Sequence, residues 1–146
     1  MTTAVNALPK LAPGTWTIDP AHSTVGFSVR HLMVSKVRGE FTEFTGAIEI
    51  AEDGTPSVKA EIDVNSIDTK NEQRDGHIRS ADFFDAEKFP KATFVSTSVE
   101  ADGDDYVVHG DFTLKGVTRP VDLKLEFNGV NPGMGQGPVA GFEAST

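Results

Sequence analysis

Histidine is the side chain of this sequence with the widest capacity for acid–base and metal chemistry. The four histidines are His22, His31, His77 and His109. Their spacing matches none of the His–His or His–Glu patterns that hold a metal on one strand or helix, so we predict no metal site. Asp19, His22 and Ser23 have the residue types of a catalytic triad. Such triads are assembled from distant segments and need an oxyanion hole, so we interpret these neighbours as a turn in which Asp19 and Ser23 cap backbone N–H groups.

Composition excludes further classes of chemistry. The 146 residues include 22 acidic and 13 basic ones, a net charge of −9 with histidine neutral, and no cysteine. The negative charge repels nucleic-acid phosphates and anionic membrane surfaces, so we expect no nucleic-acid partner. Residues 133–137 are rich in glycine but lack the flanking strand and helix of a phosphate-binding loop. No apolar run approaches the roughly 20 residues that a membrane-spanning helix needs.

Phenylalanine is the most informative residue type for ligand binding. The chain has ten phenylalanines but one tyrosine and one tryptophan. Six of the phenylalanines fall in separate strand-like runs, namely Phe27, Phe41, Phe94, Phe112, Phe127 and Phe142. These rings either fill a packed core or line a cavity. A cavity of this kind would hold hydrocarbon, because phenylalanine has no polar group.

Most of the chain alternates apolar with polar residues, which predicts β-strands. About eight such segments are joined mainly by short turns, without a helical crossover. They cover residues 15–30 with a bend at Pro20, 37–41, 48–50, 58–64, 93–99, 106–114, 121–127 and 140–144. This order predicts an antiparallel sheet closed as a barrel or a sandwich. We favour an eight-stranded barrel, whose interior is filled by side chains or holds one small ligand.

Residues 70–80 are the exception, because their pattern predicts a short helix weakened by Gly76. Thr69 and Glu72 match a capping box, in which both side chains bond backbone N–H groups of the first turn. Residues 115–120 are expected to form a turn, and residues 128–138 a long flexible loop.

Polar side chains near a barrel mouth would contact the head group of a ligand. His31 ends the first long strand, and Arg74 and His77 lie on the predicted helix. The alternative is that Arg74 and Arg79 are solvated and pair with nearby carboxylates, namely Glu72, Asp75 or Asp82.

Six ordered segments resemble the YceI-like family. They are residues 16–23 (WTIDPAHS), 25–31 (VGFSVRH), 37–41 (VRGEF), 71–85 (NEQRDGHIRSADFFD), 89–94 (FPKATF) and 110–121 (GDFTLKGVTRPV). The resemblance implies an extended lipocalin-like antiparallel β-barrel that binds a long-chain polyisoprenoid or similar amphiphilic lipid, with no enzymatic activity and no cofactor. We therefore expect a flexible arm over residues 1–14 and one barrel domain over residues 15–146.

The expected function is non-catalytic binding, transport or sequestration of such a lipid. We predict an apolar lining, a lid of two phenylalanines and polar residues near the head group. The lining is Phe27, Val29, Phe41, Ile62, Phe94, Val108, Phe112, Leu125 and Phe142; the lid is Phe83 and Phe84; the polar residues are His31, Arg74 and His77. Two other classes stay open. One is a lipid-modifying hydrolase or isomerase that uses His22 or His31, and the other is a partner-binding barrel with a filled core.

The chain departs from the family pattern in two places. Relatives continue past the Phe-Glu-Ala block with a closing segment, whereas this sequence stops at Thr146. An unclosed barrel would expose a sheet edge that pairs with a second chain, so a homodimer is one expected assembly. Many relatives carry a secretory leader, and residues 1–14 lack its charged and apolar regions. We expect a cytoplasmic protein, or a periplasmic or secreted one if a leader has been removed.

Overall fold

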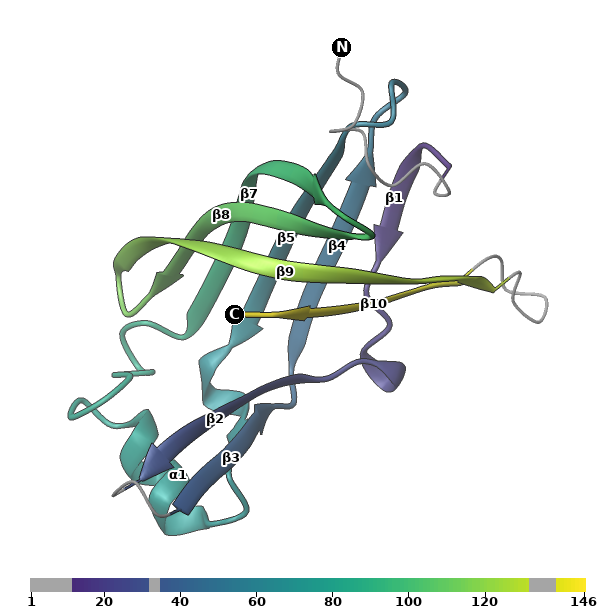
Figure 1. Cartoon of the computed structure of the whole chain (residues 1–146). Helices are drawn as coiled ribbons and strands as arrows, with labels where there is room; N and C mark the ends of the chain where they lie inside the picture. The colour runs from purple at the N-terminus through teal and green to yellow at the C-terminus, as the bar shows by residue number, and fades with distance from the viewer. Residues whose placement is uncertain (1–11, 32–34, 132–138) are drawn as a thin grey trace.

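A computed structural model describes residues 12–31, 35–131 and 139–146 of the chain. These residues form ten strands in two antiparallel sheets, together with one α-helix and two short 3₁₀ segments (Figure 1). The prediction of an all-β antiparallel fold with one helical insertion is confirmed. The strands number ten rather than eight, because the first predicted segment forms two strands and residues 67–68 add a short one before the helix.

The larger sheet has seven strands and the smaller sheet has three. In spatial order, the larger sheet consists of β1 (Gly14–Thr17), β4 (Phe44–Ile50), β5 (Pro56–Asp63), β7 (Lys91–Asp102), β8 (Asp105–Leu114), β9 (Val117–Asn131) and β10 (Val139–Ser145). The smaller sheet consists of β2 (Val25–His31), β3 (Ser35–Phe41) and β6 (Ile67–Asp68). The helix α1 (Glu72–Arg79) follows β6, and the 3₁₀ segments are Pro20–His22 and Val64–Ser66.

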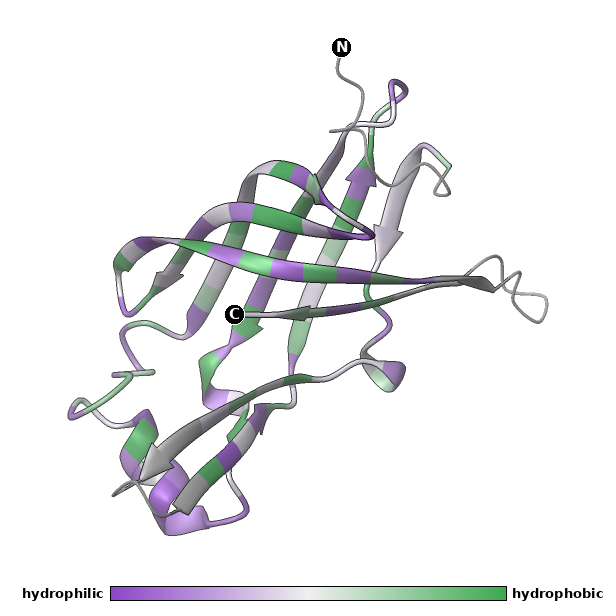
Figure 2. Ribbon diagram, viewed as in Figure 1, coloured by the Kyte–Doolittle hydropathy of each residue, from purple (hydrophilic) through white to green (hydrophobic). Residues whose placement is uncertain are grey.

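Alternation of apolar and polar residues gives the larger sheet one apolar face. In β5, Ala60 and Ile62 are half-buried, whereas Glu61 between them is exposed. The pairing register keeps this parity across the sheet, because Ala60 lies opposite Phe94 and Phe94 lies opposite Phe112. Figure 2 shows the alternation of hydrophobic and hydrophilic residues along the strands. We call the face that carries Phe94 the inner face and the opposite face the outer face.

A two-residue turn joins β8 to β9. Lys115 and Gly116 both have positive φ, 53° and 73°, as a type I′ hairpin turn requires. The turn predicted over residues 115–120 is therefore too long. Pro120 lies within β9, opposite Asp111.

The segment expected to form one long bent strand is instead two strands in different sheets. β1 pairs with β4, whereas β2 pairs with β3. Between them, Asp19 caps the 3₁₀ segment Pro20–His22 by accepting a hydrogen bond of 3.0 Å from the Ala21 N–H. The cap and the fixed φ of proline turn the chain out of the larger sheet.

The larger sheet curls, so that strands near its two ends meet across the inner face. Ile50 of β4 is buried against Trp16 of β1 and against Tyr106, Phe127 and Phe142 of β8, β9 and β10. These contacts join strands that are distant in the strand order, which a flat sheet would not allow. Within the described residues, β1 pairs with β4 and β10 with β9. The curled sheet is thus a half-barrel (Figure 1).

The helix α1 begins after Asn71, whose side-chain oxygen accepts a hydrogen bond of 3.0 Å from the Arg74 N–H. The predicted capping box is therefore wrong. The Thr69 hydroxyl donates to Asp75 Oδ1 at 2.5 Å instead. Lys70 has a φ of 64° between Thr69 and Asn71, so the chain turns before the helix starts.

Candidate ligand-binding site

The inner face carries the main hydrophobic cluster of the protein. Its four buried residues, each at most 6% exposed, are Phe94, Val99, Val108 and Leu125. Half-buried side chains pack around them: Val58, Ala60, Tyr106, Phe112, Val121, Leu123 and Phe142. These residues come from five neighbouring strands, β5 and β7 to β10, so the apolar surface is continuous along the curl.

An aromatic group extends this surface toward β1. The rings of Phe127 and Phe142 lie 5.2 Å apart and both pack on Ile50. Trp16 packs on Ile50 as well, and its indole N–H donates to the Ala12 carbonyl at 3.0 Å. The one polar atom of the indole is thereby paired, and the rest of the ring offers apolar surface. Sequence reasoning did not assign Trp16, Ile50 or Phe127 to the site.

Five predicted lining residues meet in the main cluster. They are Phe94, Val108, Phe112, Leu125 and Phe142. The register explains part of this grouping, because Phe94 lies opposite Phe112, and Val108 lies two residues before Gly110 on the same side of β8 as Phe112. Their contact with a ligand stays a prediction.

Two further predicted residues, Ile62 and Phe84, lie in an adjoining cluster. They pack on small residues that are at most 2% exposed, namely Val64, Ala86 and Ala92. Phe112 belongs to both clusters and joins the segment after α1 to the inner face. Phe84 therefore packs inward, whereas its neighbour Phe83 is 51% exposed.

The structure separates Phe27 and Phe41 from the main cluster. Both lie in the smaller sheet, where their rings are 5.6 Å apart and half-buried. Strand parity could not reveal this separation, because alternation does not indicate which sheet a strand joins. Val29 and His31 also lie in β2, and their side chains are outside the described residues.

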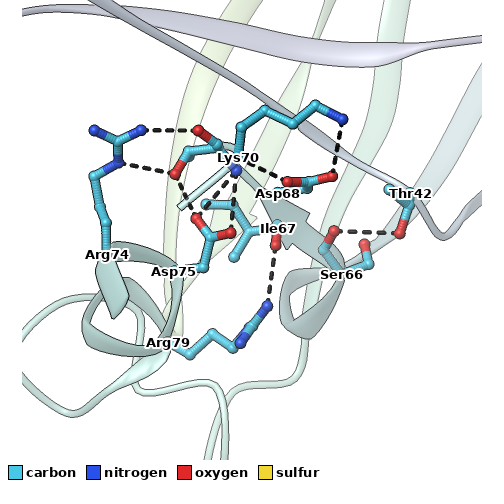
Figure 3. Close-up of polar contacts among 9 residues, drawn as sticks. Thr42, Ser66, Ile67, Asp68, Lys70, Arg74, Asp75 and Arg79 are labelled. Atoms are coloured by element: carbon cyan, nitrogen blue, oxygen red, sulfur yellow. Dashed lines mark hydrogen bonds and ion pairs between the residues drawn. The ribbon is translucent and has the colours of Figure 1, made fainter. Parts of the chain in front are cut away.

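The predicted head-group residues on α1 already have partners. Arg74 donates to Thr69 Oγ1 and to the Thr69 carbonyl, both at 2.8 Å (Figure 3). The His77 ring lies 3.1 Å from Asp82 Oδ2 and meets the Phe83 ring edge-on at 4.9 Å. These contacts connect α1 with the segments before and after it.

The two arginines of α1 differ from the expectation that they pair with carboxylates. Arg79 donates to the carbonyls of Asn65 and Ile67 at 3.0 and 3.1 Å. Arg74 likewise donates to the Thr69 carbonyl rather than to a carboxylate. Figure 3 shows Arg79 beside Ile67. Both guanidinium groups thus hold the backbone of residues 65–69, because their planar N–H donors match carbonyl oxygens.

A buried carboxylate, Asp75, completes this network, whereas the sequence indicated it only as one possible partner of a solvated arginine. Asp75 is 3% exposed and accepts hydrogen bonds from the Thr69 N–H at 3.0 Å and from the Thr69 hydroxyl. The available signal in the sequence was the spacing: Asp75 lies four residues after Asn71, where the helix begins, and Thr69 lies two residues before it. The network fixes α1 against β6, so its role is structural.

Asp19 and His22 form an exposed pair. His22 Nδ1 lies 2.7 Å from Asp19 Oδ2, and its side chain is 83% exposed. This hydrogen bond, followed by the one from the Ala21 N–H, lowers the pKa of Asp19. The interpretation of Asp19 as a turn cap is confirmed, and Ser23 ends the 3₁₀ segment.

His109 bridges two carboxylates on the outer face. Its Nδ1 lies 2.7 Å from Asp122 Oδ1, and its Nε2 lies 2.7 Å from Glu100 Oε1. The hydrogen bond with Asp122, and then that with Glu100, raises the pKa of His109. The three side chains link β7, β8 and β9 behind the main cluster.

Two surface hollows lie away from the main cluster. One of about 320 Å³ borders the β4–β5 turn and is lined by Gly14, Thr15, Glu49, Ile50, Ala51, Thr55 and Ser57. Another of about 290 Å³ is lined by Thr42, Glu43, Phe44, Thr45, Glu61, Asp63 and Lys91. Their polar and charged linings make both poor sites for hydrocarbon. Among the described residues, no three histidine, aspartate or glutamate side chains are arranged so that they could hold one metal ion, and no helix has the length and hydrophobicity to cross a membrane.

Comparison with known proteins places this fold in a family. The family model of the YceI-like domain matches residues 16–146. Protein YceI of Escherichia coli O17:K52:H18 (strain UMN026 / ExPEC) is 43% identical over 125 residues, which are 84% of this chain and 65% of that protein. The chain thus spans about two thirds of the length of this curated relative.

Solved structures show the same architecture. BcnA of Burkholderia cenocepacia has a TM-score of 0.72 at 29% identity, over 79% of this chain and 74% of that one. A polyisoprenoid-binding domain from Saccharophagus degradans has a TM-score of 0.57 at 21% identity, over 79% and 68%. That second likeness concerns the fold alone. With a family model matched along nearly all of its length and a YceI protein 43% identical to it, the chain belongs to the YceI-like domain family.

Proposed function

We propose that this protein binds a long-chain isoprenoid or similar amphiphilic lipid along the inner face of its larger sheet. The observation that carries the proposal is the continuous apolar surface from the main cluster to the aromatic group around Ile50. Phe112, Phe127 and Phe142 are only half-buried there. A large apolar surface inside a half-open barrel is a characteristic site for a hydrophobic ligand.

Burial of hydrocarbon would supply the free energy of binding. Each buried CH₂ group contributes about 0.8 kcal/mol, so one five-carbon unit contributes roughly 4 kcal/mol. Association costs roughly 4 to 15 kcal/mol in lost motion. Several isoprenoid units are therefore needed, which favours a long chain over a short one.

Family membership supports the same ligand class. The resemblance to YceI-like proteins implies a polyisoprenoid ligand, and the Saccharophagus degradans domain of the same fold is described as polyisoprenoid-binding. Because one fold supports many functions, the fold alone does not assign a ligand. The proposal therefore rests first on the apolar inner face.

The role of this binding is carriage or sequestration rather than catalysis. His22 is an exposed residue of a turn, and His109 lies on the outer face. Neither of these two histidines belongs to the main cluster, where a lipid-modifying enzyme would need its acid or base. The other candidate, His31, ends β2 in the smaller sheet. The proposed complex is therefore non-covalent, and the lipid leaves it unchanged.

Native mass spectrometry of protein purified without detergent tests the proposal. An adduct of discrete, hydrocarbon-rich mass is the expected result, and the same spectrum reports the oligomeric state. Protein that stays bare even after incubation with a long isoprenoid alcohol would contradict lipid binding and favour a filled core.

The substitution Phe142→Asp tests the location of the ligand. Phe142 contacts both parts of the apolar surface from the edge strand β10, so a carboxylate there should abolish lipid retention. Val95→Asp is the matched control, because Val95 is an exposed residue next to Phe94 on the outer face. Circular dichroism and thermal melting would check that both variants fold. A folded Phe142→Asp protein that remains fully loaded would refute the site.

A further inference from the structure

One arginine interrupts the apolar inner face. Along β9, alternate residues face inward, and five of these six positions are apolar. The six are Val117, Arg119, Val121, Leu123, Leu125 and Phe127. The register places Arg119 opposite Phe112 and Val121 opposite Gly110. Arg119 therefore shares the side of the sheet that carries the main cluster.

Neighbouring strands make this position unusual. In β4, β5, β7 and β8, as the structure describes them, the charged residues stand at outward-facing positions. On β8, for example, Asp111 and His109 alternate with the inward Gly110 and Phe112. Arg119 is thus the one charged residue at an inward position of these strands and β9.

The Arg119 side chain has no charge partner among the described residues. It is exposed, and the structure gives it no hydrogen bond or ion pair within 12–31, 35–131 and 139–146. By contrast, Lys124 further along β9 has a partner on the outer face, because its Nζ lies 3.9 Å from Asp105 Oδ2. An unpaired guanidinium is notable in a chain with 22 acidic residues and a net charge of −9.

Arg119 stands where the apolar surface opens to solvent. Val117, the preceding inward residue, is 47% exposed, whereas Leu125 further along the strand is 6% exposed. From Arg119 to Phe127 the strand spans roughly 26 Å at about 3.3 Å per residue. A hydrocarbon chain could therefore lie on the inner face with one end beside Arg119 and the other toward Phe127 and Trp16.

We propose that Arg119 binds the oxyanion head group, a phosphate or a carboxylate, of the lipid whose tail lies on the inner face. This inference rests on the proposed lipid-binding function. It assigns the ligand a negatively charged head group at Arg119 and a tail that runs toward Phe127. A guanidinium presents paired N–H donors that match oxyanions. Its location at the open end keeps the anion in water while the tail is buried.

Paired ligands that differ only in the head group test the assignment. Farnesyl phosphate, farnesol and inorganic phosphate are each titrated into the protein by isothermal calorimetry, below the concentration at which the lipids aggregate. The wild-type protein should prefer farnesyl phosphate over farnesol by roughly tenfold to a hundredfold, the range of a charge-assisted hydrogen bond. The variant Arg119→Gln should reduce that ratio to about one, and Arg119→Glu should reverse it.

Lys124→Gln is the matched control, because it removes the same charge from the same strand on the outer face. It should keep the wild-type ratio, and thermal melting would check that each variant is folded. Equal affinity of the wild-type protein for farnesol and farnesyl phosphate would overturn the role of Arg119 and leave lipid binding intact. Inorganic phosphate that binds as tightly as farnesyl phosphate would make this a site for free anions. Failure of both lipids to bind would overturn the proposed function together with this inference.

Discussion

Close packing on the inner face depends on the absence of a side chain at Gly110. A Cβ atom at this position would lie 2.7 Å from the Val95 carbonyl oxygen and in collision with the Phe94 ring. Phe94 is buried and central to the main cluster. Because Gly110 has only hydrogen in place of a side chain, the Phe94 ring can approach the backbone of the neighbouring strand closely.

Gly110→Ala should destabilise the protein by about 1 to 3 kcal/mol, because overpacking displaces Phe94 and the backbone. Urea denaturation measures the change. Gly76→Ala is the control, since a Cβ atom at this exposed helical position meets nothing within 4 Å. That control should stabilise α1 by about 0.5 to 1 kcal/mol. Equal stability of Gly110→Ala and the wild-type protein would contradict this packing of Phe94 against Gly110.

His109 gives the protein a pH-dependent contribution to stability. Its hydrogen bonds with Asp122 and Glu100 raise its pKa above the ordinary value of 6.5. A raised pKa means that the folded state binds the proton more tightly than the unfolded state. The contribution is fully present below pH 6.5 and is lost as the pH rises through the pKa of the folded protein.

Asp122→Asn should lower the pKa of His109, because it removes the larger of the two causes. Titration of the four histidines by NMR measures the shift directly. The thermal midpoint of the variant should also change less than that of the wild-type protein between about pH 6 and about pH 8. An unchanged His109 titration would show that the bridge between the strands is absent in solution.

At the scale of elements, α1 is attached by polar contacts. Asp75 accepts from Thr69, and Arg74 and Arg79 donate to carbonyls of residues 65–69. These bonds orient the helix. The segment that follows the helix contains Phe84, which packs on the adjoining cluster. The position of that segment therefore depends on a carboxylate rather than on an apolar helix face.

Asp75→Ala should cost about 1 to 3 kcal/mol of unfolding free energy, because the Thr69 N–H and hydroxyl lose their acceptor. Glu72→Ala is the matched control, since Glu72 is an exposed acidic residue in the first turn of the same helix. Chemical denaturation compares the two. A loss no larger than that of Glu72→Ala would contradict the structural role of the buried carboxylate.

At the scale of the whole molecule, the curl of the larger sheet joins strands from its two ends. Trp16 of β1 and Phe142 of β10 both contact Ile50. A ligand along the inner face would lie beside all three. The single tryptophan of the chain therefore reports on that region.

Binding of a long isoprenoid alcohol should shift or quench the emission of Trp16 and raise the thermal midpoint, because the ligand binds the folded state. With Trp16→Phe, the fluorescence change should disappear while the thermal shift remains. A thermal shift in the wild-type protein without any change in emission would place the ligand away from the aromatic group.

Much of the fold and part of the candidate site could be read from the residues alone. Strict alternation around Leu125 and Val108 correctly indicated strands and their apolar side, because side chains in a strand alternate with a period of two. The phenylalanine pattern brought Phe94, Phe112 and Phe142 into one predicted lining, and they share one cluster. The Thr69 capping box failed because Asn71 competes for the same role two residues later.

Linear sequence thus established most of the strands, their apolar faces, the net negative charge and the family. Tertiary structure decided which sheet each strand joined, moving Phe27 and Phe41 into the smaller one. It also decided the curl that carries Phe142 to Ile50, and it left Arg119 exposed at the open end of the inner face. The physical reason is that alternation reports the side of a strand on which a residue lies. The residues that a side chain packs against on that side depend on strand pairing and twist, which are properties of the whole sheet.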